Sequence, residues 1–72
     1  MYTIYHSINF TSRRLVTTVE SIEAARAMLE RFGEVISFEV DPDGHDAADA
    51  AVLAGTAANR FSLEIYSIER SI

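Results

Sequence analysis

No cysteine occurs among the 72 residues of this chain, so neither disulfide bonds nor thiolate metal sites can hold the fold together. Packing therefore has to be efficient, or a partner has to help. A chain of this length buries only about 60% of its unfolded surface, which is too little for two separate cores. We therefore expect one compact domain over residues 1–72, in a reducing compartment such as the cytoplasm.

Three segments carry the pattern of short strands. Tyr2–Phe10 alternates apolar and polar residues, which is typical of a half-buried strand. A turn at 11–13 and the β-branched run Leu15–Val19 then predict an antiparallel hairpin. Val35–Val40 alternates again, and the turn residues Asp41–Gly44 end it because proline cannot continue a strand ladder.

The clearest helix is predicted over residues 21–32. Ser21 is a suitable N-cap, and Gly33 is expected to close the helix in the left-handed conformation. Apolar residues recur between them at steps of three and four, so that they form one stripe. The members of this stripe are Ile22, Ala25, Met28, Leu29 and Phe32.

Residues 46–58 allow two interpretations. Asp46 as N-cap, several alanines and Gly55 favour a two-turn helix, and alanine content makes this the preferred one. The alternative is an edge strand over Asp49–Ala54 that pairs with the last strand.

The last strand is expected from Phe61 onwards. Phe61, Leu63 and Ile65 occupy one parity, and the apolar residues then change to Tyr66 and Ile68, as at a β-bulge or a strand end. The opposite parity of the strands predicts a polar outer face. Its members are Thr3, Tyr5, Ser7, Asn9, Ser37, Glu39, Ser62 and Glu64.

These elements predict an α+β fold. The expected order is β-β-α-β-(short α or strand)-β, with a single-layer antiparallel or mixed sheet of about four strands and one main helix packed on one face. No segment reaches the roughly 18 apolar residues of a membrane span, and no targeting signal is readable at the start, so no membrane association is expected.

Negative charge is concentrated in the middle of the sequence. The net charge is −5, yet residues 1–31 and 60–72 are close to neutral. Residues 32–59 hold six carboxylates and no arginine. Such a chain is repelled by phosphate backbones, so direct nucleic-acid binding is not expected. The carboxylates are Glu34, Glu39, Asp41, Asp43, Asp46 and Asp49.

The sequence offers little for catalysis or for metal binding. A calcium loop begun at Asp41 would place His45, Asp46 and Val52 where a ligand, a glycine and the closing glutamate are required. The three glycines stand at element ends rather than in a phosphate-binding loop. We therefore expect no enzyme activity, no metal and no cofactor.

His6 has the inward parity of the first strand, and we expect a hydrogen-bonded histidine at the rim of the sheet. If it is buried beside a carboxylate, its titration would make stability depend on pH. The other histidine, His45, lies in the acidic stretch.

The acidic stretch gives the best indication of function, as a surface that attracts a basic protein. Small acidic cysteine-free α+β proteins are frequent among phage and mobile-element accessory proteins, anti-CRISPR inhibitors included, and this chain is similar to them in class rather than in motif. The likeness implies an inhibitor or adaptor that docks on a nucleic-acid-handling protein. The alternatives are a homo-oligomerising module, such as a homodimer, and an antitoxin-like regulatory partner. The expected partner-binding residues are Tyr5, Glu39, Asp41, Asp43, Asp46, Asp49 and Tyr66.

Overall fold

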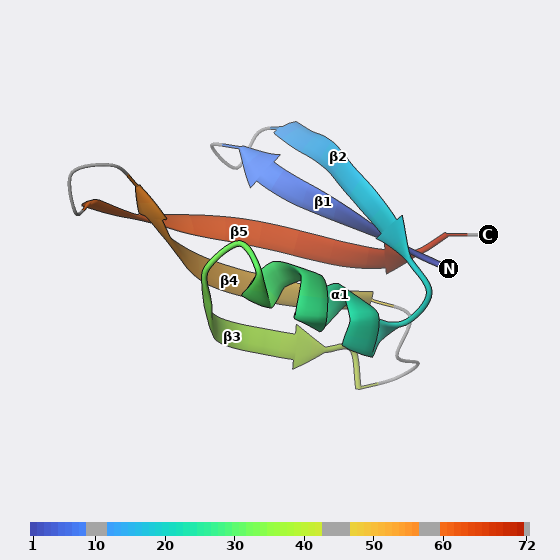
Figure 1. The fold of residues 1–72 in the computed structure, drawn as a ribbon. Helices are drawn as coiled ribbons and strands as arrows, with labels where there is room; N and C mark the ends of the chain where they lie inside the picture. Colours follow the sequence, from blue (N-terminus) through green and yellow to red (C-terminus); the bar gives the residue numbers. More distant parts are fainter. Residues whose placement is uncertain (9–11, 43–46, 57–59, 72) are drawn as a thin grey trace.

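The fold was analysed in a computed structural model, which describes residues 1–8, 12–42, 47–56 and 60–71. One five-stranded antiparallel sheet carries a single short helix on one face (Figure 1). The strand order across the sheet is β2-β1-β5-β4-β3. The elements are β1 (Tyr2–Ile8), β2 (Ser12–Val19), α1 (Ile22–Glu30), β3 (Glu34–Val40), β4 (Ala47–Thr56) and β5 (Arg60–Arg70).

The sheet is larger than the sequence pattern predicted, and the preferred interpretation of residues 46–58 was wrong. Ala47–Thr56 forms a ten-residue strand rather than a helix, so the protein is mostly β, with five strands where about four were expected. The strand pairs with β5, as the alternative proposed. It is not an edge strand, however, because β3 pairs along its other side. Residues 43–46 and 57–59, which include part of that prediction, lie outside the described residues.

The first hairpin, the helix and the third strand were predicted close to their observed positions. β1 and β2 pair antiparallel, with a register shift between Ile4 and Tyr5. β2 begins at Ser12, so the turn predicted at 11–13 was wrong for its last two residues, and residues 9–11 lie outside the described residues. Ser21 caps α1 by accepting a hydrogen bond from the backbone N–H of Ala24 at 3.0 Å. Gly33 follows the helix but its φ lies outside the left-handed range, so the expected left-handed closure was wrong.

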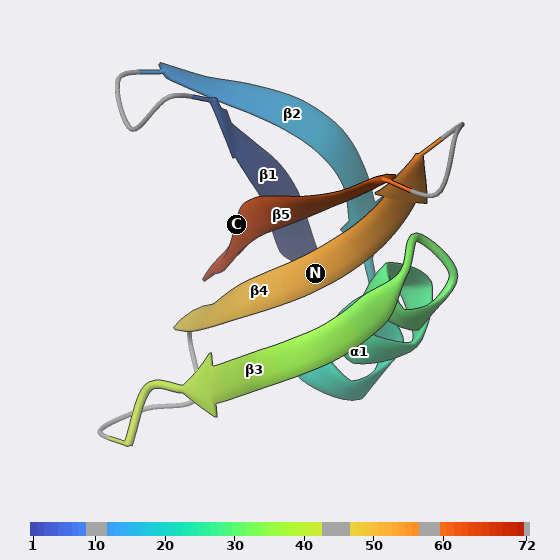
Figure 2. The same ribbon diagram turned by 90° about the vertical axis from the view of Figure 1, so that its left-hand side faces the viewer.

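The core lies between α1 and the sheet. Ala25 and Leu29 of the helix are buried against the strands, and Figure 2 shows the helix on one side only of the strongly twisted sheet. Small residues on β4 let the helix approach closely. The buried apolar residues of the described chain are Ile4, Val19, Ala25, Leu29, Ala48, Ala50, Val52, Tyr66 and Ile68.

The other face of the sheet has no element packed on it among the described residues, and we call it the open face. Side chains that are directly opposite in an antiparallel register share a face. Tyr5 and Ser7 therefore point to the open face together with Ser37 and Glu39, as predicted. Thr3 has the same parity but is only 5% exposed, and Asn9 lies outside the described residues. Within the described residues, no helix is long and apolar enough to cross a membrane.

The predicted polar face was wrong for β5. This strand runs from Arg60 to Arg70 with an unbroken register to β4, so no bulge separates Ile65 from Tyr66. Ser62 and Glu64 point to the helix side, and Phe61, Leu63 and Ile65 point to the open face. The apolar parity changes because β5 presents apolar side chains to both faces in turn. The register does shift in β3, where Ile36 is the extra residue and is 53% exposed. The alternation of Val35–Val40 had indicated an inward position for it.

Candidate functional site

Three of the five carboxylates predicted to bind a partner meet at one corner of the open face. Glu39 of β3 lies directly opposite Asp49 of β4, and both are exposed. Asp41 is at the end of β3, where its backbone N–H donates to the carbonyl oxygen of Ala47 at 2.8 Å. The three residues border one recess of about 320 Å³. We call Glu39, Asp41 and Asp49 the acidic corner. Asp43 and Asp46 lie outside the described residues.

Two members of the acidic corner, Glu39 and Asp49, lie on paired strands, and no described arginine neutralises their charge. Among the described residues, no arginine forms an ion pair with Glu39 or Asp49. Arg13 is paired with Glu69, and Arg26 with Glu30 on the helix at 3.4 Å. Within the described residues, no group of three or more histidine, aspartate or glutamate side chains lies close enough together to hold a metal ion.

The structure separates the two tyrosines that were predicted as anchors. Tyr5 is on the open face, in the same row across the sheet as the acidic pair, because Asp49 and Tyr5 both lie opposite Ser67. Two strand spacings separate them, roughly 10 Å. The guanidinium of Arg13 sits 4.3 Å from the Tyr5 ring centroid. Tyr5 therefore belongs to the same surface as the acidic corner.

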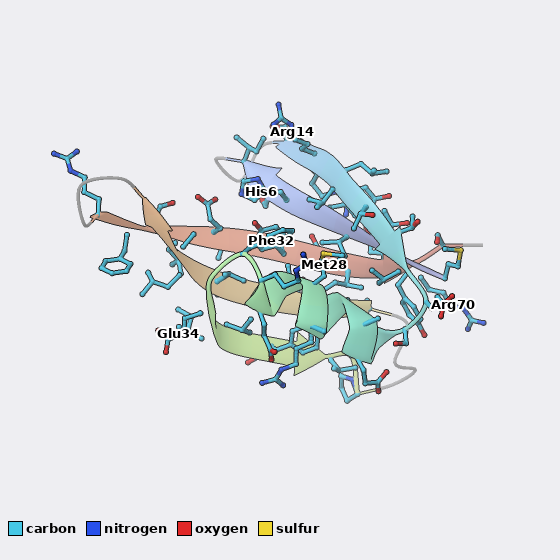
Figure 3. All side chains as sticks on the ribbon, in the orientation of Figure 1. His6, Arg14, Met28, Phe32, Glu34 and Arg70 are labelled. Atoms are coloured by element: carbon cyan, nitrogen blue, oxygen red, sulfur yellow. The ribbon has the colours of Figure 1, made fainter. Side chains whose placement is uncertain are left out.

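Tyr66 lies on the other face of the sheet and is only 8% exposed. Its ring stacks on His6, with centroids 5.0 Å apart, and on Phe32 at 6.0 Å. Figure 3 shows His6 on β1 and Phe32 just after the end of the helix. Burial raises the pKa of the Tyr66 phenol, and the Glu64 carboxylate adds to this effect. Tyr66 is thus a packing residue that the structure does not bring to the acidic corner.

A polar cluster that the sequence did not predict lies beside Tyr66. His6 Nε2 and Glu64 Oε2 are 2.5 Å apart, and the Ser62 hydroxyl donates to the other oxygen of Glu64. The expected hydrogen-bonded histidine at the rim is therefore observed. Its partner could not be found locally, because Glu64 is 58 positions away and had been placed on the opposite face.

The cluster borders a recess of about 300 Å³ between residues 6–8 and 62–65. The order in which Ser62, Glu64 and His6 contact one another does not suit nucleophilic catalysis. In a hydrolase triad the histidine contacts the serine, whereas here the carboxylate stands between Ser62 and His6. The Ser62 hydroxyl therefore donates to the Glu64 carboxylate rather than to the imidazole of His6.

The hydrogen bonds from Ser62 and His6 hold the pKa of the Glu64 carboxyl below its usual value of 4.5. A carboxyl with a lowered folded-state pKa stabilises the fold above its unfolded pKa, and this contribution is lost as the pH falls through the folded value. We expect a Glu64→Gln variant to have a lower thermal midpoint than the wild type at about pH 6, with the difference shrinking below about pH 4.5. Circular dichroism melts over this range measure it.

Glu34→Gln is the matched control for this effect. Glu34 is exposed and projects away from the start of β3 (Figure 3), and it makes no ion pair among the described residues. Its substitution should leave the pH profile close to that of the wild type. A difference between wild type and Glu64→Gln that stays constant from neutral to acidic pH would show that the carboxylate hydrogen bonds add no stability.

The open face also carries an apolar row that the sequence assigned to the core. Phe61 and Leu63 are 69% and 57% exposed, and Ile65 continues the row along β5. Leu53 of β4 lies directly opposite Leu63. Apolar residues on both parities of an eleven-residue strand are typical of a central strand, and this was the available indication that the row leaves the core.

The open face thus combines an acidic corner, one tyrosine and an apolar row on a single sheet surface. Comparison with family models, with curated proteins and with solved structures finds no match to this chain.

Proposed function

We propose that this protein is a cytoplasmic protein-binding module, an inhibitor or adaptor, whose acidic corner docks on the basic surface of a nucleic-acid-handling protein. The observation that carries the proposal is the in-register pair Glu39–Asp49, which no described arginine neutralises. The partner is defined by its chemistry: a cluster of lysine and arginine side chains that would otherwise contact phosphates.

The acidic pair is unfavourable for the isolated sheet. Like charges directly opposite each other on neighbouring strands destabilise the pair by an amount comparable to the 0.2–1 kcal/mol that favourable pairs contribute, so about that much is lost here. A cationic side chain placed between the two carboxylates would relieve the repulsion and gain two charge-assisted hydrogen bonds. Binding of a basic partner therefore removes a cost that the free protein carries.

The residues around the Glu39–Asp49 pair favour a protein as the binding partner rather than a small ion. Tyr5 lies in the same row of the sheet, and aromatic residues are enriched in protein interfaces. Asp41 adds a third carboxylate to the same recess. Several carboxylates at one corner also steer a basic partner during association, an effect that salt screens over about 8 Å at physiological ionic strength.

Charge reversal tests the proposal. We expect the tagged protein to capture a basic, nucleic-acid-binding protein from a lysate of the organism that carries the gene, with identification by mass spectrometry. The double variant Glu39→Arg, Asp49→Arg should lose this capture, and the affinity of the purified pair should fall at least tenfold between about 50 and 300 mM salt because the contact is ionic.

The control variant is Glu20→Arg, Glu30→Arg, which changes the net charge equally. Both residues are exposed; Glu20 precedes the helix and Glu30 ends it. Capture should persist with this variant. Unchanged capture by a folded Glu39→Arg, Asp49→Arg protein would reduce the acidic corner to a solvated surface and overturn the proposal.

A further inference from the structure

A second surface, separate from the acidic corner, lies at the other end of the open face. It is the apolar row described above, which consists of Leu53, Phe61, Leu63 and Ile65, and we call it the apolar ridge from here on. Ala51 and Gly55 complete the same parity of β4, so these positions of the two strands carry no charge. Glu34, opposite Leu53 on β3, is the carboxylate that borders the ridge.

The ridge stands on a part of the sheet that has few neighbours. β1 pairs with residues of β5 from Ile65 to Arg70, and β3 pairs with residues of β4 from Ala48 to Leu53. Among the described residues, Arg60–Glu64 therefore has β4 as its one strand neighbour. Figure 1 shows the end of β4 and the start of β5 extending beyond the other strands. An isolated two-stranded ribbon is marginally stable in water, so packing on its apolar face would stabilise it.

The surface area of the protein is consistent with a missing contact. A compact monomer of 8.0 kDa would expose about 4,450 Å², whereas this chain exposes 5068 Å². The excess, roughly 600 Å², approaches the 800 Å² or so that each partner contributes to a standard interface. The chain is 40 Å long but only 20 Å thick, and an elongated shape of this kind exposes more surface than a compact one.

Association through the outer edges of the sheet is disfavoured. The ladders of both edge strands, β2 and β3, contain an irregularity, and exposed charged residues stand on both edges. Bulges and charges on edge strands are the features that prevent edge-to-edge pairing. The face of the ribbon has neither, so a contact would form there.

We propose that the apolar ridge binds the apolar ridge of a second copy of this chain, related by a two-fold axis that passes near Leu63. A second copy fits better than a cationic partner because the ridge itself offers no carboxylate. Two chains of net charge −5 repel each other, but the ridge positions themselves carry no charge. Glu34, in the same row as Leu53 and Leu63, is the carboxylate at the border of the contact.

The two-fold axis runs across the strands, so that β5 of one copy crosses β5 of the other in the opposite direction. The ridge ends at Ile65, and the Glu39–Asp49 pair lies in the next row, opposite Ser67. The acidic corners then lie at the two far ends of the dimer and stay exposed. The dimer does not depend on a cationic partner, although it would present two acidic corners to one.

Sedimentation equilibrium of the purified protein tests this assembly. The wild type should sediment at 16 kDa, twice the 8.0 kDa of one chain, and Phe61→Asp, Leu63→Asp should sediment as a monomer. The dissociation constant should rise more than about 30-fold, as at the centre of an interface. Leu15→Asp is the control, because Leu15 is 60% exposed on the open face but lies on β2, away from the ridge. This variant should remain dimeric.

A cysteine cross-link tests the same contact without adding charge. The chain has no cysteine, so Leu63→Cys introduces a single thiol close to the proposed two-fold axis. Mild oxidation should convert Leu63→Cys to a disulfide-linked dimer and leave Leu15→Cys monomeric on denaturing gels. A wild type that stays monomeric at high concentration would overturn the proposal, as would equal cross-linking of the two variants or dissociation by Leu15→Asp.

Discussion

Replacing Leu29 with alanine is expected to remove about half of the stability of this protein. Leu29 is 0% exposed, and it is the large side chain that α1 buries completely against the sheet. Leucine-to-alanine changes in cores destabilise by about 2–5 kcal/mol, because the transfer free energy and the cavity both count. A 72-residue domain has roughly 4–11 kcal/mol in total.

Part of the core around Leu29 cannot move to fill the cavity. The buried residues of β4 that share its cluster include Ala48 and Ala50, whose side chains are single methyl groups without rotamers. Urea unfolding should therefore show a much lower midpoint for Leu29→Ala. Leu15→Ala removes the same atoms from an exposed position and should change stability by less than about 0.5 kcal/mol. A loss below about 1 kcal/mol for Leu29→Ala would mean that the sheet is stable without the helix.

The sequence was sufficient for elements whose pattern is local. Ser21 and the buried positions Ala25 and Leu29 lie within a few residues of one another, so capping and helical periodicity located α1 to within two residues at each end. The hairpin of β1 and β2 was predictable for the same reason. In each case the interactions that define the element are made by near neighbours in the sequence.

β4 could not be recognised because alanine fits both structures. Its helix-facing residues, Ala48 and Ala50, are small so that α1 can approach, and a row of alanines has helical propensity but little visible alternation. Propensity differences of a few tenths of a kcal/mol per residue are outweighed by pairing with two neighbouring strands. An α+β fold was predicted and a mostly β fold is observed, and this one segment accounts for the difference.

The candidate surfaces depended on register, which local patterns do not contain. Glu39 and Asp49 were both predicted as partner-binding residues, but their direct opposition follows from the pairing of β3 with β4. Phe61 and Leu63 were expected in the core because large apolar residues are usually buried. Not every large apolar residue is buried, however, and a group of them exposed on one surface indicates a binding site for another molecule.

Gly33→Ala is expected to be the other severely destabilising substitution, although no left-handed conformation is involved. A Cβ atom at residue 33 would lie 2.4 Å from the carbonyl oxygen of Leu53 and 2.9 Å from the Cα of Ala54. Both are backbone atoms of β4, so no side-chain rotation can relieve the clash. The turn between α1 and β3 would have to move away from the sheet.

Overpacking of this kind costs about 1–3 kcal/mol, and a backbone clash belongs at the upper end of that range. We expect the thermal midpoint of Gly33→Ala to fall by more than about 10 °C, since 1 kcal/mol corresponds to 4–8 °C in a domain of this size. Gly55→Ala is the matched control, because its Cβ would meet nothing closer than the Phe61 ring at 3.9 Å. This variant should melt at the wild-type temperature or slightly above it, because alanine restricts the unfolded chain. Equal midpoints for the two variants would mean that the turn after α1 is not seated on β4, and the helix would then lack its fixed position over the core.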